Sequence, residues 1–190
     1  MNEMTFGFAM CGSYCTFGTV LEEMKKIADK GYHLLPIMSE NASSTDTRFG
    51  NAKDFVQQVS GICGREVITS IVGAEPIGPK KLVDLMIVAP CTGNTLAKLA
   101  NGITDTAVTM AVKSCLRIGI PVVLAPATND ALAASAQNLG RLMNRKHIYF
   151  VPMHQDNPGQ KPNSAVAEFS LILPTALVAL KGEQIQPIWQ

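Results

Sequence analysis

The chain is organised around one continuous segment, Leu85-Met86-Ile87-Val88-Ala89-Pro90-Cys91-Thr92-Gly93-Asn94-Thr95-Leu96-Ala97-Lys98-Leu99-Ala100-Asn101-Gly102-Ile103-Thr104-Asp105. An apolar run ends at a proline, small polar residues follow, and a helical pattern begins with no bulky side chain between them. A buried strand that delivers hydroxyl and amide groups to the start of a helix is a common ligand-holding geometry at the carboxyl edge of a sheet. An ordinary strand–loop–helix connection has the same spacing, so both interpretations stay open at this point.

Apolar strand patterns alternate with amphipathic helical patterns along the rest of the chain. Strands are predicted over residues 5–11, 32–38, 66–72, 84–89, 121–125 and 147–151, and helices over 17–30, 52–62, 104–117, 130–145 and 165–181. Pro174 is expected to kink or split the last helix, and residues 73–79 are too rich in proline and glycine for regular structure. The alternation predicts an α/β fold: a Rossmann-like, doubly wound three-layer sandwich with a mostly parallel sheet of about six strands.

Length and composition narrow the class of protein. A chain of 190 residues is most simply one domain, here 1–190, with a C-terminal loop and helix over 156–190. Hydrophobic residues make up 47% and charged residues 16%, a balance that suggests either burial against other copies of the chain or a thick core. The net charge of +1 without a basic cluster disfavours nucleic acid, and no apolar run approaches the roughly 20 residues that span a membrane.

The cysteines and histidines suggest neither disulfides nor a metal site. Five cysteines occur without a CxxC pair and without a secretion signal, so reduced thiols in a cytoplasmic protein are expected. Cys11 and Cys91 lie at strand ends, where packing is favoured over a catalytic thiol. The three histidines lack metal-ligand spacing, so no metal is predicted, and no GxSxG elbow is present.

The loops after the first two predicted strands carry candidate anion-binding groups. Gly12 and Ser13 come directly before a helix, where backbone N–H groups and the helix dipole suit one phosphate monoester. Ser39 and Asn41 follow the next strand and could reach the same anion. The alternative is that both serines cap a helix or turn. The loop lacks the GxGxxG fingerprint, which disfavours a nicotinamide site.

Two later loops add neutral polar groups. Thr92, Asn94 and Thr95 follow the 84–89 strand and can bond carbonyls, ring nitrogens or ribityl hydroxyls. Thr128 and Asn129 form a similar group after the 121–125 strand, although Asn129 or Asp130 could instead be the N-cap of the next helix.

Residues 89–105 resemble the signature of a family of small flavoproteins, which includes the cysteine decarboxylases and the flavin prenyltransferases. Pro126-Ala127-Thr128-Asn129 is similar to a second signature of that family, although Leu132 and Ala133 stand where a tryptophan and a methionine usually follow. The resemblance implies flavin mononucleotide (FMN) as cofactor, with Gly12, Ser13 and Ser39 at the phosphate and the loop from Thr92 to Thr95 at the flavin. It also implies a homo-oligomer built from trimers.

One departure concerns the reaction. The cysteine decarboxylases carry a catalytic histidine in the loop before the fourth strand, whereas residues 74–79 here hold none. The whole chain is most similar to family members that act beside a separate A subunit to convert dihydrodipicolinate to dipicolinate in the mother-cell cytoplasm of sporulating bacteria. That resemblance implies an oxidoreductase subunit with a small dicarboxylate substrate, whose catalytic residues the sequence does not identify. A non-catalytic supporting subunit and a decarboxylase-like or prenyltransferase-like enzyme remain the alternatives.

Overall fold

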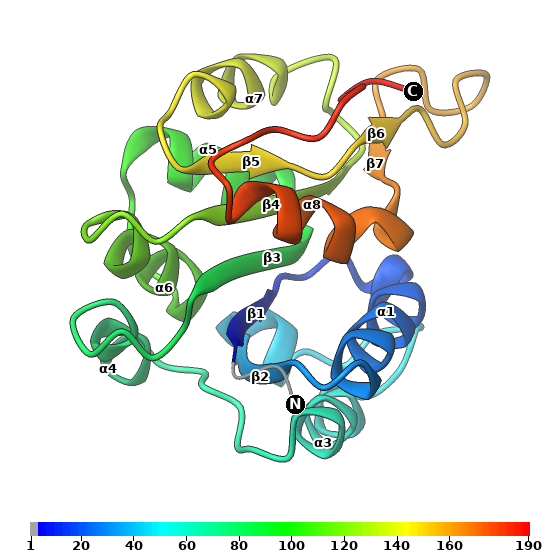
Figure 1. Cartoon of the computed structure of the whole chain (residues 1–190). Helices are drawn as coiled ribbons and strands as arrows, with labels where there is room; N and C mark the ends of the chain where they lie inside the picture. Colours follow the sequence, from blue (N-terminus) through cyan, green and yellow to red (C-terminus); the bar gives the residue numbers. More distant parts are fainter. Residues whose placement is uncertain (1–3) are drawn as a thin grey trace.

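The computed structural model describes residues 4–190 and contains a seven-stranded sheet with helices on both faces (Figure 1). The strand order is β2-β1-β3-β4-β7-β6, with β5 also beside β4. The five parallel strands are β1 (Thr5–Met10), β2 (His33–Met38), β3 (Leu85–Cys91), β4 (Val122–Thr128) and β5 (Ile148–Phe150). The antiparallel strands are β6 (Met153–His154) and β7 (Ala165–Ala167). The predicted α/β class with a mostly parallel sheet is confirmed.

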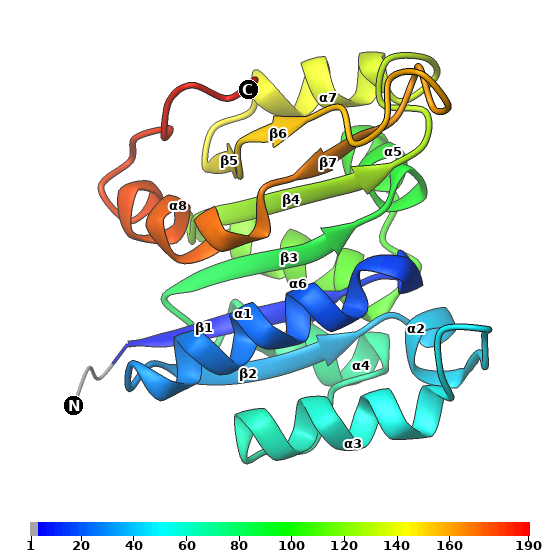
Figure 2. The same ribbon diagram turned by 90° about the vertical axis from the view of Figure 1, so that its right-hand side faces the viewer.

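Helices form a layer on each side of this sheet. One face is covered by α1 (Phe17–Asp29), α3 (Ala52–Cys63) and α8 (Ile172–Ala179). The other face is covered by α4 (Ile71–Ala74), α5 (Gly93–Asn101), α6 (Ala107–Leu116) and α7 (Ala136–Met143). A short helix, α2 (Glu40–Ser44), follows β2 at the carboxyl edge (Figure 2).

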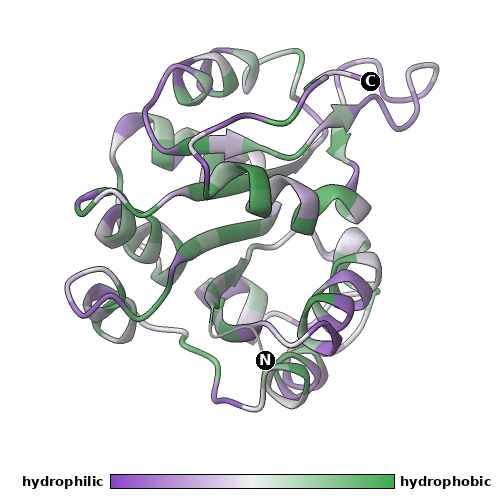
Figure 3. Ribbon diagram, in the orientation of Figure 1, coloured by the Kyte–Doolittle hydropathy of each residue, from purple (hydrophilic) through white to green (hydrophobic). Residues whose placement is uncertain are grey.

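Each central strand is apolar on both sides because both faces are covered. In β3, Leu85 and Ile87 belong to the core beneath α1 and α8, whereas Met86 and Val88 belong to the core beneath α5 and α6. Burial on both faces explains why the strand is a continuous apolar run rather than an alternating one. Figure 3 shows this as hydrophobic colour along β3 and β4, with hydrophilic colour on the outward sides of the helices.

The connections create a switch point between β1 and β3. From β1 the chain passes through α1 to β2 on one side, and β3 then pairs with β1 on its other side. Parallel sheets leave a crevice outside the carboxyl ends of their strands at such a point, because the connections depart in opposite directions. Figure 2 shows the carboxyl ends of β2, β3 and β4 on one side of the molecule, next to α2 and the start of α5.

The strand predicted over 66–72 is wrong. Within this stretch only Ile68 pairs with the sheet, through an isolated parallel bridge to Ile37. Helix α4 begins at Ile71, and the Ser70 side chain accepts a hydrogen bond of 3.1 Å from the N–H of Gly73. A serine cap therefore overrides the β-branched run. Residues 75–77 continue as a 3-10 turn, so the stretch predicted to be irregular is largely helical.

The C-terminal prediction is wrong in its first part. Residues 165–167 form β7, which pairs with β4 and β6, and a 3-10 turn at Phe169–Leu171 precedes α8. Pro174 is the third residue of α8, where its missing N–H has no intrahelical partner to lose, so it does not split the helix. Two other helices are shorter than predicted, because α6 starts after its Thr106 cap and turns occupy residues 130–135 before α7.

Candidate functional site

A polar cleft of about 430 Å³ lies at the carboxyl edge of the sheet, at the switch point between β1 and β3. The loops after β1, β2 and β3 and the approach to α6 all contribute to it. Six of the nine residues predicted for the site line this cleft: Gly12, Ser39, Asn41, Thr92, Asn94 and Thr95. Segments that are far apart in the sequence therefore meet at one place in the fold.

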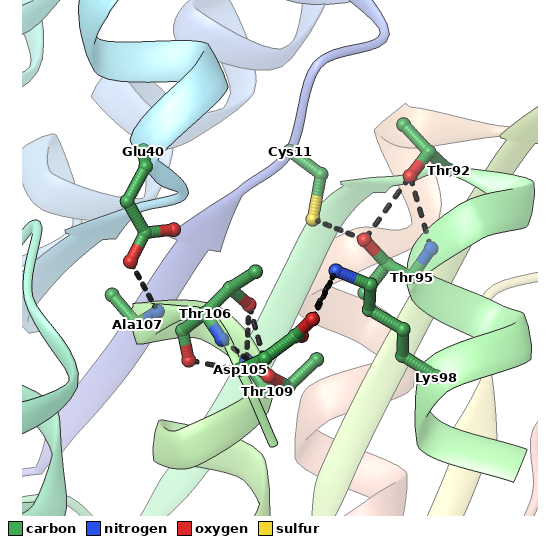
Figure 4. A network of polar contacts seen from close by, with 9 residues as sticks. All are labelled: Cys11, Glu40, Thr92, Thr95, Lys98, Asp105, Thr106, Ala107 and Thr109. Carbon is green, nitrogen blue, oxygen red and sulfur yellow. Dashed lines mark hydrogen bonds and ion pairs between the residues drawn. The ribbon is translucent and has the colours of Figure 1, made fainter. Parts of the chain in front are cut away.

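The loop after β3 presents Asn94 at the start of α5. Thr92 is the N-cap, and its hydroxyl oxygen accepts from the N–H of Thr95 at 3.2 Å. The same hydroxyl donates to the Thr95 hydroxyl at 3.0 Å, which in turn donates to Cys11 Sγ at 3.2 Å (Figure 4). These bonds tie the start of α5 to the end of β1 and leave Asn94 exposed to the cleft.

The loop after β2 is held by a cap and by a tyrosine. Ser39 is only 8% exposed, and its side chain accepts from the N–H of Ala42 at 3.3 Å. The Tyr14 hydroxyl donates to the carbonyl of Asn41 at 2.7 Å, which joins the loops after β1 and β2. Ser39 is thus a helix cap, as the alternative interpretation expected, and it still lines the cleft.

Gly12 and Ser13 have different positions in the loop after β1. Gly12 lines the cleft, and a Cβ atom there would lie 3.3 Å from the Tyr14 ring. The carbonyl of Ser13 accepts from the N–H and the hydroxyl of Thr16, at 3.0 and 2.8 Å. Ser13 is not part of the cleft lining, and a 3-10 turn at Tyr14–Thr16 separates this loop from α1.

Thr128 and Asn129 do not line the cleft. The Thr128 hydroxyl donates to Asp130 Oδ1 at 2.5 Å, and the hydroxyl of buried Ser135 donates to the same oxygen at 2.8 Å. This cluster backs onto the start of α5, because a Cβ on Gly93 would lie 2.6–2.8 Å from all three side chains. Thr128 therefore supports the loop after β3 from behind, while Asn129 is exposed.

The cleft is also lined by residues outside the predicted cofactor set: Cys11, Tyr14, Glu40, Lys98, Asp105 and Thr106. Lys98 Nζ lies 2.8 Å from Asp105 Oδ1. Glu40 Oε1 accepts from the N–H of Ala107 at 3.2 Å and so joins α2 to the start of α6 (Figure 4). The signature contains Lys98 and Asp105, but only their tertiary pairing marks them as part of the cleft.

The thiols beside the cleft are neutral near physiological pH. Burial raises the pKa of Cys11 to about 11, although the hydrogen bond from Thr95 opposes part of that effect. Burial also raises the pKa of Cys91 well above its usual value. All five cysteines are free, as expected, and burial makes Cys11 and Cys91 poor nucleophiles.

An ion pair between Lys98 and Asp105 lies in the cleft. The hydrogen bond from Lys98 holds the pKa of the Asp105 carboxyl below its usual range, so Asp105 is ionised at neutral pH. The described residues contain no cluster of three or more histidine, cysteine or acidic side chains suited to a metal ion. Within residues 4–190, no helix combines the length and the hydropathy that crossing a bilayer requires.

Comparison with known proteins gives consistent results. The family model described as Flavoprotein matches residues 2–170. The B subunit of dipicolinate synthase from Bacillus subtilis (strain 168) is 45% identical over 182 residues, which cover 96% of this chain and 91% of that protein. The crystal structure of the B subunit of dipicolinate synthase from Bacillus halodurans superposes with a TM-score of 0.90 at 41% identity, covering 100% of this chain and 98% of that chain.

More distant structures share the fold. The FMN-dependent cysteine decarboxylase SpaF matches with a TM-score of 0.65 at 18% identity, covering 94% of this chain and 97% of that chain. At this identity the likeness concerns the arrangement of strands and helices, and the chemistry has to be argued from the cleft.

Proposed function

Because the chain belongs to the flavoprotein family, we propose that it is the FMN-binding subunit of a dipicolinate synthase, acting with an A subunit to convert dihydrodipicolinate to dipicolinate. The observation that carries the proposal is the polar cleft at the carboxyl edge, lined by six of the predicted cofactor residues. Two relatives that carry the name of this subunit, each more than 40% identical over nearly the whole chain, support the substrate and the partner.

The residues of the cleft fit the polar parts of FMN. Its volume of about 430 Å³ lies within the roughly 300–1,000 Å³ of small-molecule sites. The first-turn N–H groups of α5, at Gly93 and Asn94, have no intrahelical partners and favour an anion or a carbonyl. Asn41 and Asn94 add amides that can both donate and accept. We assign Gly12, Ser39 and Asn41 to the phosphate side, and Thr92, Asn94 and Thr95 to the flavin side. Ser13, Thr128 and Asn129 do not line the cleft and are left out of this assignment.

The proposed reaction is an aromatising oxidation of a dicarboxylate ring. FMN, when bound, supplies an acceptor for the hydride that leaves the ring, and a proton leaves the ring as well. The chain's own contribution is binding and orientation: the capped start of α5 holds Asn94, and the Tyr14–Asn41 bond holds the opposite wall. The raised thiol pKa values support a site without cysteine nucleophiles.

A decarboxylase-like activity has less support. Residues 74–79 contain no histidine, and this segment packs against α6 instead of lining the cleft. The N–H of Gly78 donates to Ser114 Oγ at 3.2 Å, and a Cβ on Gly78 would overlap the carbonyl of Ser114. The segment is therefore built for tight packing on α6.

The proposal extends to assembly and location. We expect a homo-oligomer based on trimers, an A subunit as heterologous partner, and the mother-cell cytoplasm as location. The low content of charged residues, 16%, is compatible with surface buried between copies. Light scattering of the purified chain measures the first of these directly, and a monomer at micromolar concentration would contradict it.

The test of function uses the purified full chain and its A subunit. We expect the chain to bind FMN with a shifted visible absorption spectrum, and dipicolinate to form faster with both subunits than with either alone. If the chain retains no flavin absorption after excess FMN has been removed, the flavin role in the proposal is wrong. Equal rates with and without bound FMN would instead favour a supporting, non-catalytic subunit.

A further inference from the structure

Among the described residues that line the cleft, Lys98 carries the one cationic side chain. The other ionisable groups there are the carboxyls of Glu40 and Asp105, the Tyr14 hydroxyl and the Cys11 thiol. A substrate that carries two carboxylates requires a cation or an array of N–H donors at its binding site. Lys98 is therefore the residue in the cleft with the right charge for that task.

The fold places the Lys98 side chain at the cleft. Leu96 and Leu99 anchor α5 to the sheet, and the cap at Thr92 sets where the helix begins. The Lys98 side chain is only 20% exposed, which restricts its ammonium to a small region beside the cleft. Gly102 ends the helix at a φ of +73° and turns the chain back, so that Asp105 meets Lys98 (Figure 4).

The two carboxylates beside Lys98 are held differently. Glu40 is bound to the N–H of Ala107 at the start of α6, where the helix dipole offsets its charge. Asp105 is 56% exposed and lies on the connection between α5 and α6. An ion pair with so exposed a carboxylate is weak, because water solvates Asp105 once the pair opens. A ligand carboxylate can therefore replace Asp105 at Lys98 at little cost.

We propose that Lys98 binds a carboxylate of the dicarboxylate substrate, and that Asp105 holds the Lys98 ammonium in the cleft until that carboxylate arrives. The proposal rests on the proposed function and deepens it by assigning the residue that recognises the substrate class. In this role Asp105 competes with the ligand for Lys98. In a purely structural ion pair, Asp105 would instead support ligand binding.

Calorimetric titration of the full chain with dipicolinate, with and without added FMN, tests this assignment. Lys98→Met keeps the aliphatic stem and removes the charge, so we expect affinity to fall by roughly tenfold or more. Lys98→Arg should retain affinity within about threefold, since it restores the charge. Lys26→Met is the matched control because it removes an ion pair of similar length, with Glu23, on α1 away from the cleft. The control should bind dipicolinate as the parent does.

Asp105→Asn separates the two roles of the ion pair. Loss of a competing carboxylate should tighten dipicolinate about threefold, whereas loss of a structural tie would weaken it. Weaker binding by Asp105→Asn, unchanged binding by Lys98→Met, or a parent chain that does not bind dipicolinate would each overturn the assignment.

FMN affinity, measured by flavin fluorescence on the same variants, separates this inference from the proposed function. We expect Lys98→Met to bind FMN like the parent chain. If Lys98→Met no longer binds FMN but still binds dipicolinate, Lys98 contacts the cofactor and its assignment to the substrate is wrong. If the parent chain binds no FMN but binds dipicolinate through Lys98, the flavin role falls and this inference stands.

Discussion

Asn94 combines two properties of a ligand-binding residue: it lies in the first turn of α5, and its side chain is exposed in the cleft. The hydroxyl of neighbouring Thr92 donates to Thr95, and the Thr95 hydroxyl donates to Cys11. Replacement of either threonine would therefore disturb the fold and the site together. Asn94 offers a cleaner test of the assigned flavin side.

We expect Asn94→Ala to weaken FMN binding about tenfold through the loss of one buried hydrogen bond. The stability of the cofactor-free chain should change by less than about 0.5 kcal/mol, as for exposed positions in general. Fluorescence titration and urea denaturation measure the two quantities. Gln57→Ala, which removes an exposed amide from α3, is the control. Equal FMN affinity of Asn94→Ala and the parent chain would refute the assignment.

Cysteine reactivity checks the environment of the cleft. With the pKa of Cys11 near 11, only about one molecule in a thousand carries its thiolate at pH 8. Cys15 is exposed in the 3-10 turn that precedes α1. We expect iodoacetamide at pH 8 to label Cys15 in the native protein and to leave Cys11 and Cys91 unlabelled until urea unfolds it. Peptide mapping by mass spectrometry reads this out, and rapid native labelling of Cys11 would contradict the burial argument.

At the scale of elements, the start of α5 is held from both sides. The hydroxyl of Thr95 in its first turn donates to Cys11 directly after β1, and Gly93 packs against the cluster of Thr128, Asp130 and Ser135. The half-buried Asp130 carboxylate accepts from two hydroxyls, and loss of either donor leaves it partly unsatisfied. The cluster thus fixes the position of the helix that presents Asn94.

Ser135→Ala should therefore lower the free energy of unfolding by about 1–2 kcal/mol, because Asp130 Oδ1 loses one of its two donors. Urea denaturation followed by circular dichroism measures the change. Ser170→Ala removes a similar hydroxyl bond of 2.7 Å to Glu168, but at an exposed position, so its effect should stay below about 0.5 kcal/mol. Equal effects for the two substitutions would mean that burial of the cluster contributes nothing.

At the scale of the whole molecule, the cleft joins loops from both helical layers at one edge of the sheet. Groups from β1, β2, β3 and the approach to α6 surround it. A ligand that contacts all of them binds the folded chain and not the unfolded one. Ligand binding and global stability are therefore linked.

FMN at a hundred times its dissociation constant should stabilise the chain by about 2.7 kcal/mol. For a chain of this length that corresponds to a rise in Tm of roughly 5–10 °C. Differential scanning calorimetry with FMN, and with riboflavin as the control that lacks the phosphate, measures it. A Tm that does not move with FMN concentration would speak against the site.

Local chemistry in the sequence was enough to predict the alternation of strands and helices, the parallel core and the loops that carry candidate ligands. Long apolar runs such as β3 and strong helical periods such as α1 determine these features with little help from the rest of the chain. The resemblance of residues 89–105 to flavoproteins added the cofactor. Gly12, Ser39, Asn41 and Asn94 could be proposed together because parallel strands end at one edge.

Tertiary structure decided the short and the paired elements. Residues 66–72 have a strand-like composition, but the Ser70 cap starts α4, while residues 165–167 become a strand only because β4 and β6 offer open edges. The Lys98–Asp105 pair, the Glu40–Ala107 bridge and the position of Thr128 behind Gly93 likewise depend on contacts between distant segments. Hydrophobic periodicity specifies which face of an element is buried, whereas these contacts depend on which neighbour covers it.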